Sequence, residues 1–194
     1  MTAESLRPWP VPPPNGYTVD DLFALPDLPP HTELIDGSLV FVSPQQVFYM
    51  ATMHLLESGL HRTLPGHLRV GREMTVVLGP CNALEPDLFV VRKEALRSRR
   101  QTSFEAADVL LVVEVVSPDS GARDRDTKPR KYAAAGIPHF WLVEMAGEED
   151  QPVVYTYERD PVTQAYGLSG IHHDRLKLSV PYALDIDLTD AALG

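Results

Sequence analysis

The sequence predicts an α/β protein whose C-terminal part is rich in β-structure. Residues 88–91 and 110–116 are apolar runs rich in valine, which is typical of strands buried on both faces. Residues 45–64 carry apolar side chains at helical spacing, and residues 124–136 indicate a second helix that ends at a glycine. Further strand-like runs at 138–144, 153–157, 166–168 and 176–180 make the C-terminal part β-rich.

The N-terminal residues predict an arm followed by two small elements. Residues 1–15 contain five prolines and predict an extended arm, and we expect residues 16–194 to form one domain. Residues 18–25 predict a short helix capped by Thr18. Asp36 and Gly37 stand between two apolar runs and predict a hairpin over residues 33–42, with Glu33 at its entry.

The remaining connections give weaker signals. The helix over residues 45–64 should end at Pro65 and Gly66. Residues 67–78 predict a strand or a hairpin, and residues 95–108 predict a polar connection that is partly helical. An acidic turn at 147–150 should join two of the C-terminal strands.

Composition excludes several classes of protein. Cys81 is the only cysteine, so the chain has neither an intramolecular disulfide nor a cysteine-rich zinc site. No apolar run reaches the roughly 20 residues that cross a bilayer, and the N-terminus lacks the pattern of a signal peptide, so we expect a cytoplasmic protein that does not bind membranes. The sequence has no serine nucleophile elbow and no glycine-rich phosphate loop.

The charge is strongly negative but unevenly distributed. A net charge of −10 opposes non-specific binding of nucleic acid by the whole molecule. More than half of the 17 basic residues nevertheless lie in two short segments on either side of residues 110–116. They are either solvated surface or a positive rim around an acidic centre; they are Arg92, Lys93, Arg97, Arg99 and Arg100, and then Arg123, Arg125, Lys128, Arg130 and Lys131.

Two predicted strands each carry an acid near one end. Glu114 lies within an otherwise apolar strand, where an isolated carboxylate must be protonated, paired with a cation or bound to a metal. Asp87 stands at the start of residues 88–91, and the two acids converge if their strands are neighbours. Carboxylate oxygens favour Mg²⁺ or Mn²⁺.

Each candidate also has a purely structural explanation. Glu114 could pair with an arginine such as Arg123 and have no chemical role, and Asp87 could cap the turn begun by Pro86. Lys128 could be an ordinary surface residue, and Glu33 an edge residue of its hairpin.

Taken together, the motifs over roughly residues 17–157 resemble the Uma-two family of putative restriction endonucleases, a branch of the PD-(D/E)XK nuclease superfamily. The resemblance is carried by Tyr17-Thr18 before a helix, Glu33-Leu34-Ile35-Asp36-Gly37, Ser43-Pro44, Glu85-Pro86-Asp87, Glu114-Val115-Val116-Ser117-Pro118, Asp124 with Lys128 and Tyr132, Gly136-Ile137-Pro138 and Phe140-Trp141-Leu142-Val143. It implies a restriction-endonuclease-like core in which a central mixed β-sheet is flanked by helices.

The resemblance also assigns roles to individual residues. It implies that Asp87 and Glu114 are catalytic metal ligands and that Glu33 completes the metal shell. The superfamily lysine normally lies two residues after the glutamate, where this chain has Val116, so Lys128 on the following helix is the candidate, with Asp124 one turn before it and Lys131 in reserve. Pro129 suits the first turn of a helix.

Two functions therefore compete. The first is a Mg²⁺- or Mn²⁺-dependent endonuclease that hydrolyses DNA and uses Asp87, Glu114 and Lys128 as catalytic residues. The second is a catalytically silent module that binds nucleic acid or a protein. In either case we expect a homodimer, and the candidate DNA contacts are Arg123, Arg125, Arg130 and Lys131.

Overall fold

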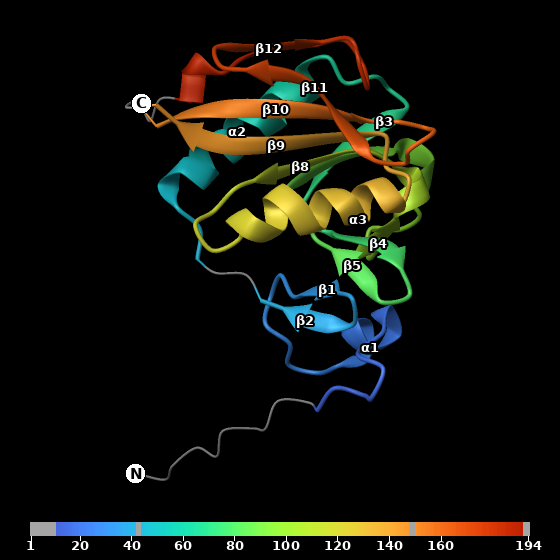
Figure 1. The fold of residues 1–194 in the computed structure, drawn as a ribbon. Helices are drawn as coiled ribbons and strands as arrows, with labels where there is room; N and C mark the ends of the chain where they lie inside the picture. Colours follow the sequence, from blue (N-terminus) through green and yellow to red (C-terminus); the bar gives the residue numbers. More distant parts are fainter. Residues whose placement is uncertain (1–10, 42–43, 148–149, 192–194) are drawn as a thin grey trace.

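The computed structural model describes residues 11–41, 44–147 and 150–191, and a six-stranded mixed sheet forms its centre (Figure 1). Strands β8 and β9 are parallel and the other pairs are antiparallel, which confirms the predicted central mixed sheet. Its order is β11 (Tyr166–His172), β10 (Gln151–Arg159), β9 (His139–Ala146), β8 (Val109–Val115), β6 (Leu88–Arg92) and β3 (Leu68–Arg72).

A second, smaller sheet lies beside the centre and contains the N-terminal hairpin (Figure 1). Asp36 and Gly37 have φ angles of 48° and 75°, as the predicted hairpin turn requires. The predicted cap of α1 (Val19–Ala24) is present, because Thr18 and Asp21 form a capping box. The strand order is β2 (Ser38–Val40), β1 (Glu33–Ile35), β5 (Asn82–Leu84), β4 (Thr75–Gly79) and β7 (Ser103–Glu105).

Helices cover both faces of the central sheet. Helix α2 (Val47–Arg62) packs on one face through Met53, Leu56 and Leu60, which are buried together with alternate residues of β8. On the other face a π-helical segment (Arg123–Thr127) continues into α3 (Lys128–Ala134), whose Tyr132 is fully buried (Figure 1). Each face of β8 therefore has its own apolar cluster, which is the burial that its valine-rich sequence predicts.

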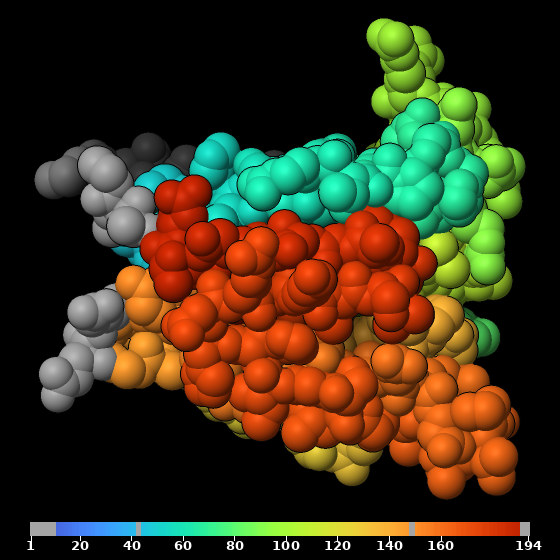
Figure 2. Space-filling view, turned by 90° about the horizontal axis from the view of Figure 1, so that it is seen from above, coloured from blue at the N-terminus to red at the C-terminus, as the bar shows by residue number. Residues whose placement is uncertain are grey.

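The C-terminal strands add a further layer. Strands β12 (Arg175–Leu178) and β13 (Leu184–Asp187) form an antiparallel pair, and Leu184 and Ile186 of β13 belong to the same buried cluster as α2. In Figure 2 these strands, in red, lie against the cyan and green surface of α2 and β3. In the part of the chain that the structure describes, no helix combines the length and apolar character needed to cross a membrane.

The structure differs from the sequence-based expectations in three regions of the chain. Residues 67–78 do not form a hairpin, because β3 and β4 belong to different sheets. The connection over 95–108 contains β7, which pairs in parallel with β4, beside short 3-10 turns at Lys93–Ala95 and Ala106–Asp108. Strand β13 and a last 3-10 turn at Thr189–Ala191 have no counterpart in the prediction. Most of the predicted arm lies outside the described residues.

One glycine of the central sheet is required by close packing. Gly71 on β3 lies opposite Phe89 on β6, and a Cβ atom at Gly71 would be 2.2 Å from the Cζ atom of that ring. Because Phe89 is fully buried, its ring has no free space to enter. We expect Gly71→Ala to lower the free energy of unfolding by about 1–3 kcal/mol, measured by urea denaturation.

Gly66 provides the matched control. A Cβ atom there would meet no other atom within 4 Å, so Gly66→Ala should change the unfolding free energy by no more than about 1 kcal/mol. Equal stability of the two alanine variants would contradict the packing that we describe around Phe89.

Candidate functional site

Two neighbouring strands bring Asp87 and Glu114 to one place. Strands β6 and β8 pair antiparallel with Leu88 opposite Val113, so Asp87 lies beside the C-terminal end of β8. Its Oδ2 atom accepts a hydrogen bond of 2.6 Å from the backbone N–H of Val115, and its Oδ1 atom accepts one of 2.9 Å from the hydroxyl of Tyr49. Asp87, which follows Pro86, is thus hydrogen-bonded to the neighbouring strand β8 and to Tyr49.

Glu114 is buried and paired, with only 2% of its surface exposed. The Lys128 Nζ atom lies 2.9 Å from its Oε2 atom, and the Tyr132 hydroxyl donates to its Oε1 atom at 2.5 Å. Both partners come from α3, one helical turn apart, so they reach the strand from the same side. The cation beside Glu114 is therefore Lys128, not an arginine such as Arg123 as the purely structural alternative supposed.

Lys128 joins the two sheets. Its Nζ atom lies 3.1 Å from the Oε1 atom of Glu33, at the start of β1, and 3.4 Å from the Oδ1 atom of Asp124. Lys128 and Glu33 are both buried, so neither is the surface or edge residue that the structural alternatives required. We call Glu33, Asp87, Glu114 and Asp124 the acid cluster. Its members come from both sheets and from the helix that follows β8.

The π-helical segment gives this helix its geometry around Pro129. The N–H of Lys128 bonds to the carbonyl of Arg123, five residues back. Pro129 has no N–H to donate, and the residues before it are already helical, so it lies within a continuous helical stretch where the π-helical segment passes into α3 rather than at the start of a helix. With the segment wound in this way, Asp124, Lys128 and Tyr132 all face the sheet and are buried.

The acid cluster holds more negative charge than its lysine can balance. Burial raises the pKa of Asp87 to about 7 despite the opposing influence of Lys128. Burial likewise raises the pKa of Glu114 and of Asp124, and Lys128 again acts in the opposite direction. Burial alone would lower the pKa of Lys128, but the carboxylates, with Glu114 foremost, raise it well above its usual value, so this lysine is protonated.

Sequence reasoning missed several side chains that orient these groups. The hydroxyl of Tyr49 on α2 donates a hydrogen bond to Asp87 and lies 3.1 Å from Glu73. Sequence reasoning predicts no role for Tyr49, because α2 is distant in sequence from Asp87. The contact of Tyr132 with Glu114 had a detectable signal, namely its spacing of four residues from Lys128 on the same helix. Asp124 additionally accepts a hydrogen bond from the hydroxyl of Ser120.

The predicted DNA-binding residues do not gather around the acid cluster. Arg125 pairs with Glu144 at 2.6 Å, Arg130 pairs with Asp126, and Lys131 pairs with Asp36. Arg123 is partly buried, and among the described residues its Nε atom has no hydrogen-bond partner. Arg125, Arg130 and Lys131 are therefore each paired with an acid outside the acid cluster.

The chemistry of the acid cluster fits a hard divalent cation. All its donors are carboxylate oxygens, and the Oδ1 atom of Asp124 is buried without a hydrogen bond. Within the described ranges, no three acidic, histidine or cysteine side chains are already arranged around one point as a metal site. Lys128 supplies the positive charge between Glu33, Glu114 and Asp124, so binding of a metal requires a small rearrangement of these side chains.

Comparisons with known proteins agree with this architecture. Residues 19–192 match the model of a protein family described as Uma2, putative restriction endonuclease. A search of curated proteins gave no match to the chain. The family match covers both sheets, the helices α1 to α3 and every member of the acid cluster.

A solved structure shows the same fold. The crystal structure of a putative nuclease belonging to DUF820 from Anabaena variabilis matches this chain with a TM-score of 0.66 and 18% sequence identity. The match covers 90% of this chain and 96% of the other.

Proposed function

Because this chain belongs to the Uma2 family of putative restriction endonucleases, we propose that it is a divalent-metal-dependent nuclease that hydrolyses phosphodiester bonds of DNA. One observation carries the proposal: buried carboxylates from two sheets and one helix meet around a single buried lysine. Burying several like charges is costly unless they bind a cation or serve a reaction.

Asp87 and Glu114 would hold Mg²⁺ or Mn²⁺, and Glu33 would complete the shell. When bound, such an ion lowers the pKa of a coordinated water and neutralises charge on a phosphoryl oxygen. Tyr49 and the N–H of Val115 fix the carboxylate of Asp87, and Tyr132 fixes that of Glu114, so both ligands are oriented by hydrogen bonds to neighbouring side chains and backbone.

Lys128 would bring its ammonium group to the scissile phosphate and stabilise the negative charge that develops there. Asp124 and Glu33 hold the Nζ atom within 3.4 Å and act as positioning residues for it. Arg123, Arg125, Arg130 and Lys131 would contact backbone phosphates of the DNA. Exposed ion pairs such as Arg130 with Asp126 are weak and can be exchanged for a phosphate.

The proposal includes the state of the protein in the cell. Residues 16–194 would act as one nuclease unit preceded by the proline-rich arm, and the chain would form a homodimer in the cytoplasm. The family resemblance supports these points, and light scattering of the purified protein measures the assembly.

A second candidate is a catalytically silent module that binds DNA or a protein. It is favoured by Lys128, which balances part of the acid cluster without a metal. Such a module would bind DNA equally well with and without Mg²⁺, and its affinity would fall steeply with salt.

Calorimetric titration with Mg²⁺ or Mn²⁺ separates the two candidates. We expect one binding event in the native protein and none in Glu114→Gln, which keeps the shape of the side chain but removes its charge. Supercoiled plasmid should be cut only when the metal is present, and chelation with EDTA should stop the reaction. Because a metal can be recruited together with DNA, the titration is repeated with a short DNA duplex present. Metal-independent binding of that duplex without any cleavage would favour the silent module.

A further inference from the structure

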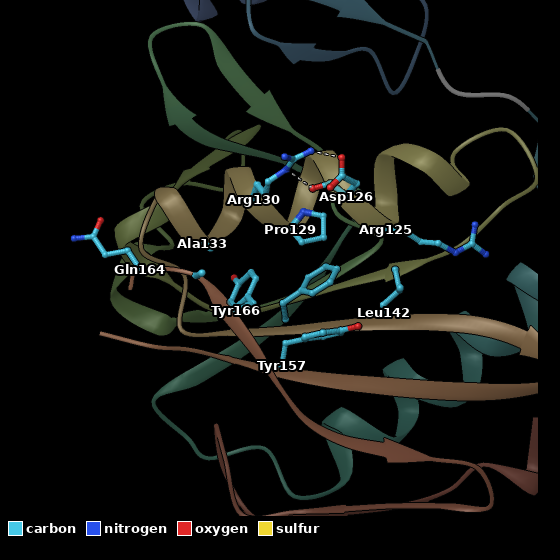
Figure 3. Close-up of a pocket in the computed structure, with 11 residues that line it drawn as sticks. Arg125, Asp126, Pro129, Arg130, Ala133, Leu142, Tyr157, Gln164 and Tyr166 are labelled. Atoms are coloured by element: carbon cyan, nitrogen blue, oxygen red, sulfur yellow. Dashed lines mark hydrogen bonds and ion pairs between the residues drawn. The ribbon is translucent and has the colours of Figure 1, made fainter. Parts of the chain in front are cut away.

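A pocket of about 290 Å³ opens beside α3 (Figure 3), and it is lined by other positions of the helix than those that contact the acid cluster. The helix contributes Pro129 and Ala133, and the central sheet contributes side chains of β9, β10 and β11. In Figure 3 the helical residues lie on one side of the pocket, and Tyr157 and Tyr166 lie on the other. The proposed function assigns DNA contacts to Arg125 and Arg130 of this pocket but gives no role to its aromatic side chains.

The sheet side of the pocket is aromatic. The ring centroid of Phe140 lies 5.6 Å from that of Tyr157 and 5.5 Å from that of Tyr166, and the ring of Phe140 is stacked with that of Tyr166 at 22°. Phe140 is fully buried, whereas both tyrosines are partly exposed and face the opening. Tyr166 is fixed by a hydrogen bond of 2.9 Å from its hydroxyl to the carbonyl of Ile137. The pocket therefore presents flat rings that are held in place.

The opposite rim carries two arginines, each paired with an acid. Arg125 and Arg130 line the pocket, and 54% and 71% of their side-chain surfaces are exposed. Their ion pairs with Glu144 and Asp126 orient the guanidinium groups but are exposed and weak. An incoming phosphate can replace either acid, since a guanidinium can bind phosphate oxygens with two hydrogen bonds. A flat ring with an attached phosphate thus matches the pocket at both ends.

The pocket adjoins the acid cluster through the sheet. Leu142, which lines the pocket on β9, is the cross-strand partner of Glu114 on the parallel strand β8. Paired strands lie about 4.8 Å apart, and Phe140 also contacts Tyr132, whose hydroxyl bonds to Glu114. A ligand in the pocket would therefore lie close to a phosphate bound at the acid cluster.

We propose that this pocket binds one unpaired nucleotide of a DNA strand, with its base on Tyr157 and its phosphate at Arg125 and Arg130. The inference rests on the proposed function for its ligand class, since it places the nucleotide next to the scissile phosphate. Bases of an intact duplex are stacked on one another and cannot reach a pocket of this kind. The protein would therefore prefer DNA with an unpaired nucleotide beside the cleavage site.

The test measures binding without cleavage. Fluorescently labelled oligothymidylate of about ten nucleotides and a duplex of equal length are titrated with Asp87→Asn protein in EDTA, and fluorescence anisotropy is recorded. A second substitution, Tyr157→Leu, in the Asp87→Asn protein should weaken binding of the single strand about 5- to 150-fold, the usual loss for one base stacked on an aromatic ring. Binding of the duplex should stay within about twofold. Adding Arg130→Gln should also weaken the single strand, and Arg99→Gln, at an exposed arginine outside the pocket, is the matched control.

A strand that contains abasic sites isolates the stacking contact. The Asp87→Asn protein should bind the abasic strand more weakly than it binds oligothymidylate. The variant that also carries Tyr157→Leu should bind the two strands equally well. Unchanged single-strand binding in both pocket variants would overturn the proposal, as would an equal loss for single strand and duplex in the variant that carries Tyr157→Leu. Because no metal is present, these results do not depend on catalysis. If the protein cleaves DNA but the pocket variants bind single strand normally, the nuclease proposal stands and the pocket proposal fails. If the pocket variants lose single-strand binding but the native protein cleaves no DNA, the pocket proposal stands and the nuclease proposal fails.

Discussion

Asp87→Asn should reduce the rate of plasmid cleavage by about 100-fold or more. Asparagine keeps an oxygen that can accept the hydrogen bond from Val115, so the strand pair should remain intact. It loses the negative charge that a divalent ion needs, and a bound metal supplies several kcal/mol of transition-state stabilisation, with each 1.36 kcal/mol equal to a factor of ten. Initial rates of supercoiled plasmid conversion at saturating Mg²⁺ measure the effect.

Asp190→Asn makes the same chemical change at an exposed position of the last 3-10 turn and should leave the rate unchanged. Thermal unfolding of both variants checks that they are folded. If Asp87→Asn cuts plasmid at the native rate, Asp87 is no metal ligand and its hydrogen bonds serve only to join β6 to β8.

Lys128→Met should lower the free energy of unfolding by about 3–5 kcal/mol in the absence of metal. Methionine fills a similar volume but removes the cation that lies within 3.4 Å of Glu33, Glu114 and Asp124. These carboxylates stay buried, and a buried charge without its partner is strongly destabilising. Urea denaturation in EDTA measures the loss, and cleavage should fall as well, because the ammonium group at the scissile phosphate is gone.

Lys131→Met is the matched control and also tests the reserve lysine. Lys131 pairs with Asp36, of which 66% of the side-chain surface is exposed, so its loss should cost at most about 1 kcal/mol of stability. As the loss of one of several phosphate contacts, it should weaken DNA binding but leave the cleavage rate at saturating DNA close to native. Combining Lys128→Met with Glu114→Gln should recover part of the stability, because one unpaired charge is removed with its partner. The lysine assignment is wrong if Lys131→Met abolishes cleavage and Lys128→Met does not.

Much of the site's framework could be predicted from local sequence. Asp36-Gly37 determines a hairpin through its positive φ angles, and the hairpin places Glu33 at the start of β1. The valine-rich runs predict buried strands, and an acid at the end of each predicts a meeting point if the strands pair, as β6 and β8 do. The family resemblance predicts Lys128 as the catalytic lysine, which stays a prediction, and the structure places its Nζ atom 2.9 Å from the Oε2 atom of Glu114.

The parts that sequence could not supply depend on contacts between distant segments. Tyr49 reaches Asp87 from α2, 38 residues away, and nothing in the spacing of that helix distinguishes this tyrosine from other core residues. The division of residues 67–78 between two sheets depends on the strands that each half pairs with. Strand β3 pairs with β6, whereas β4 pairs with β5 and β7. The aromatic pocket is likewise assembled from three strands and a helix.

The helix after β8 contributes residues to both the acid cluster and the aromatic pocket, so its winding sets the position of both. Positions 124, 128 and 132 face the acid cluster, and positions 125, 129 and 133 line the aromatic pocket, so the two rows run in parallel at the same spacing. Neighbouring positions differ by about 100° around a helix axis. Deletion of one residue at the π-helical turn would therefore turn both rows together and present Arg125, Pro129 and Ala133 to the carboxylates, and an insertion of one residue would turn them in the opposite direction. The number of residues between 117 and 128 is thus fixed by the register of the helix, and substitution of exposed residues within this segment should be tolerated far better than any change in its length.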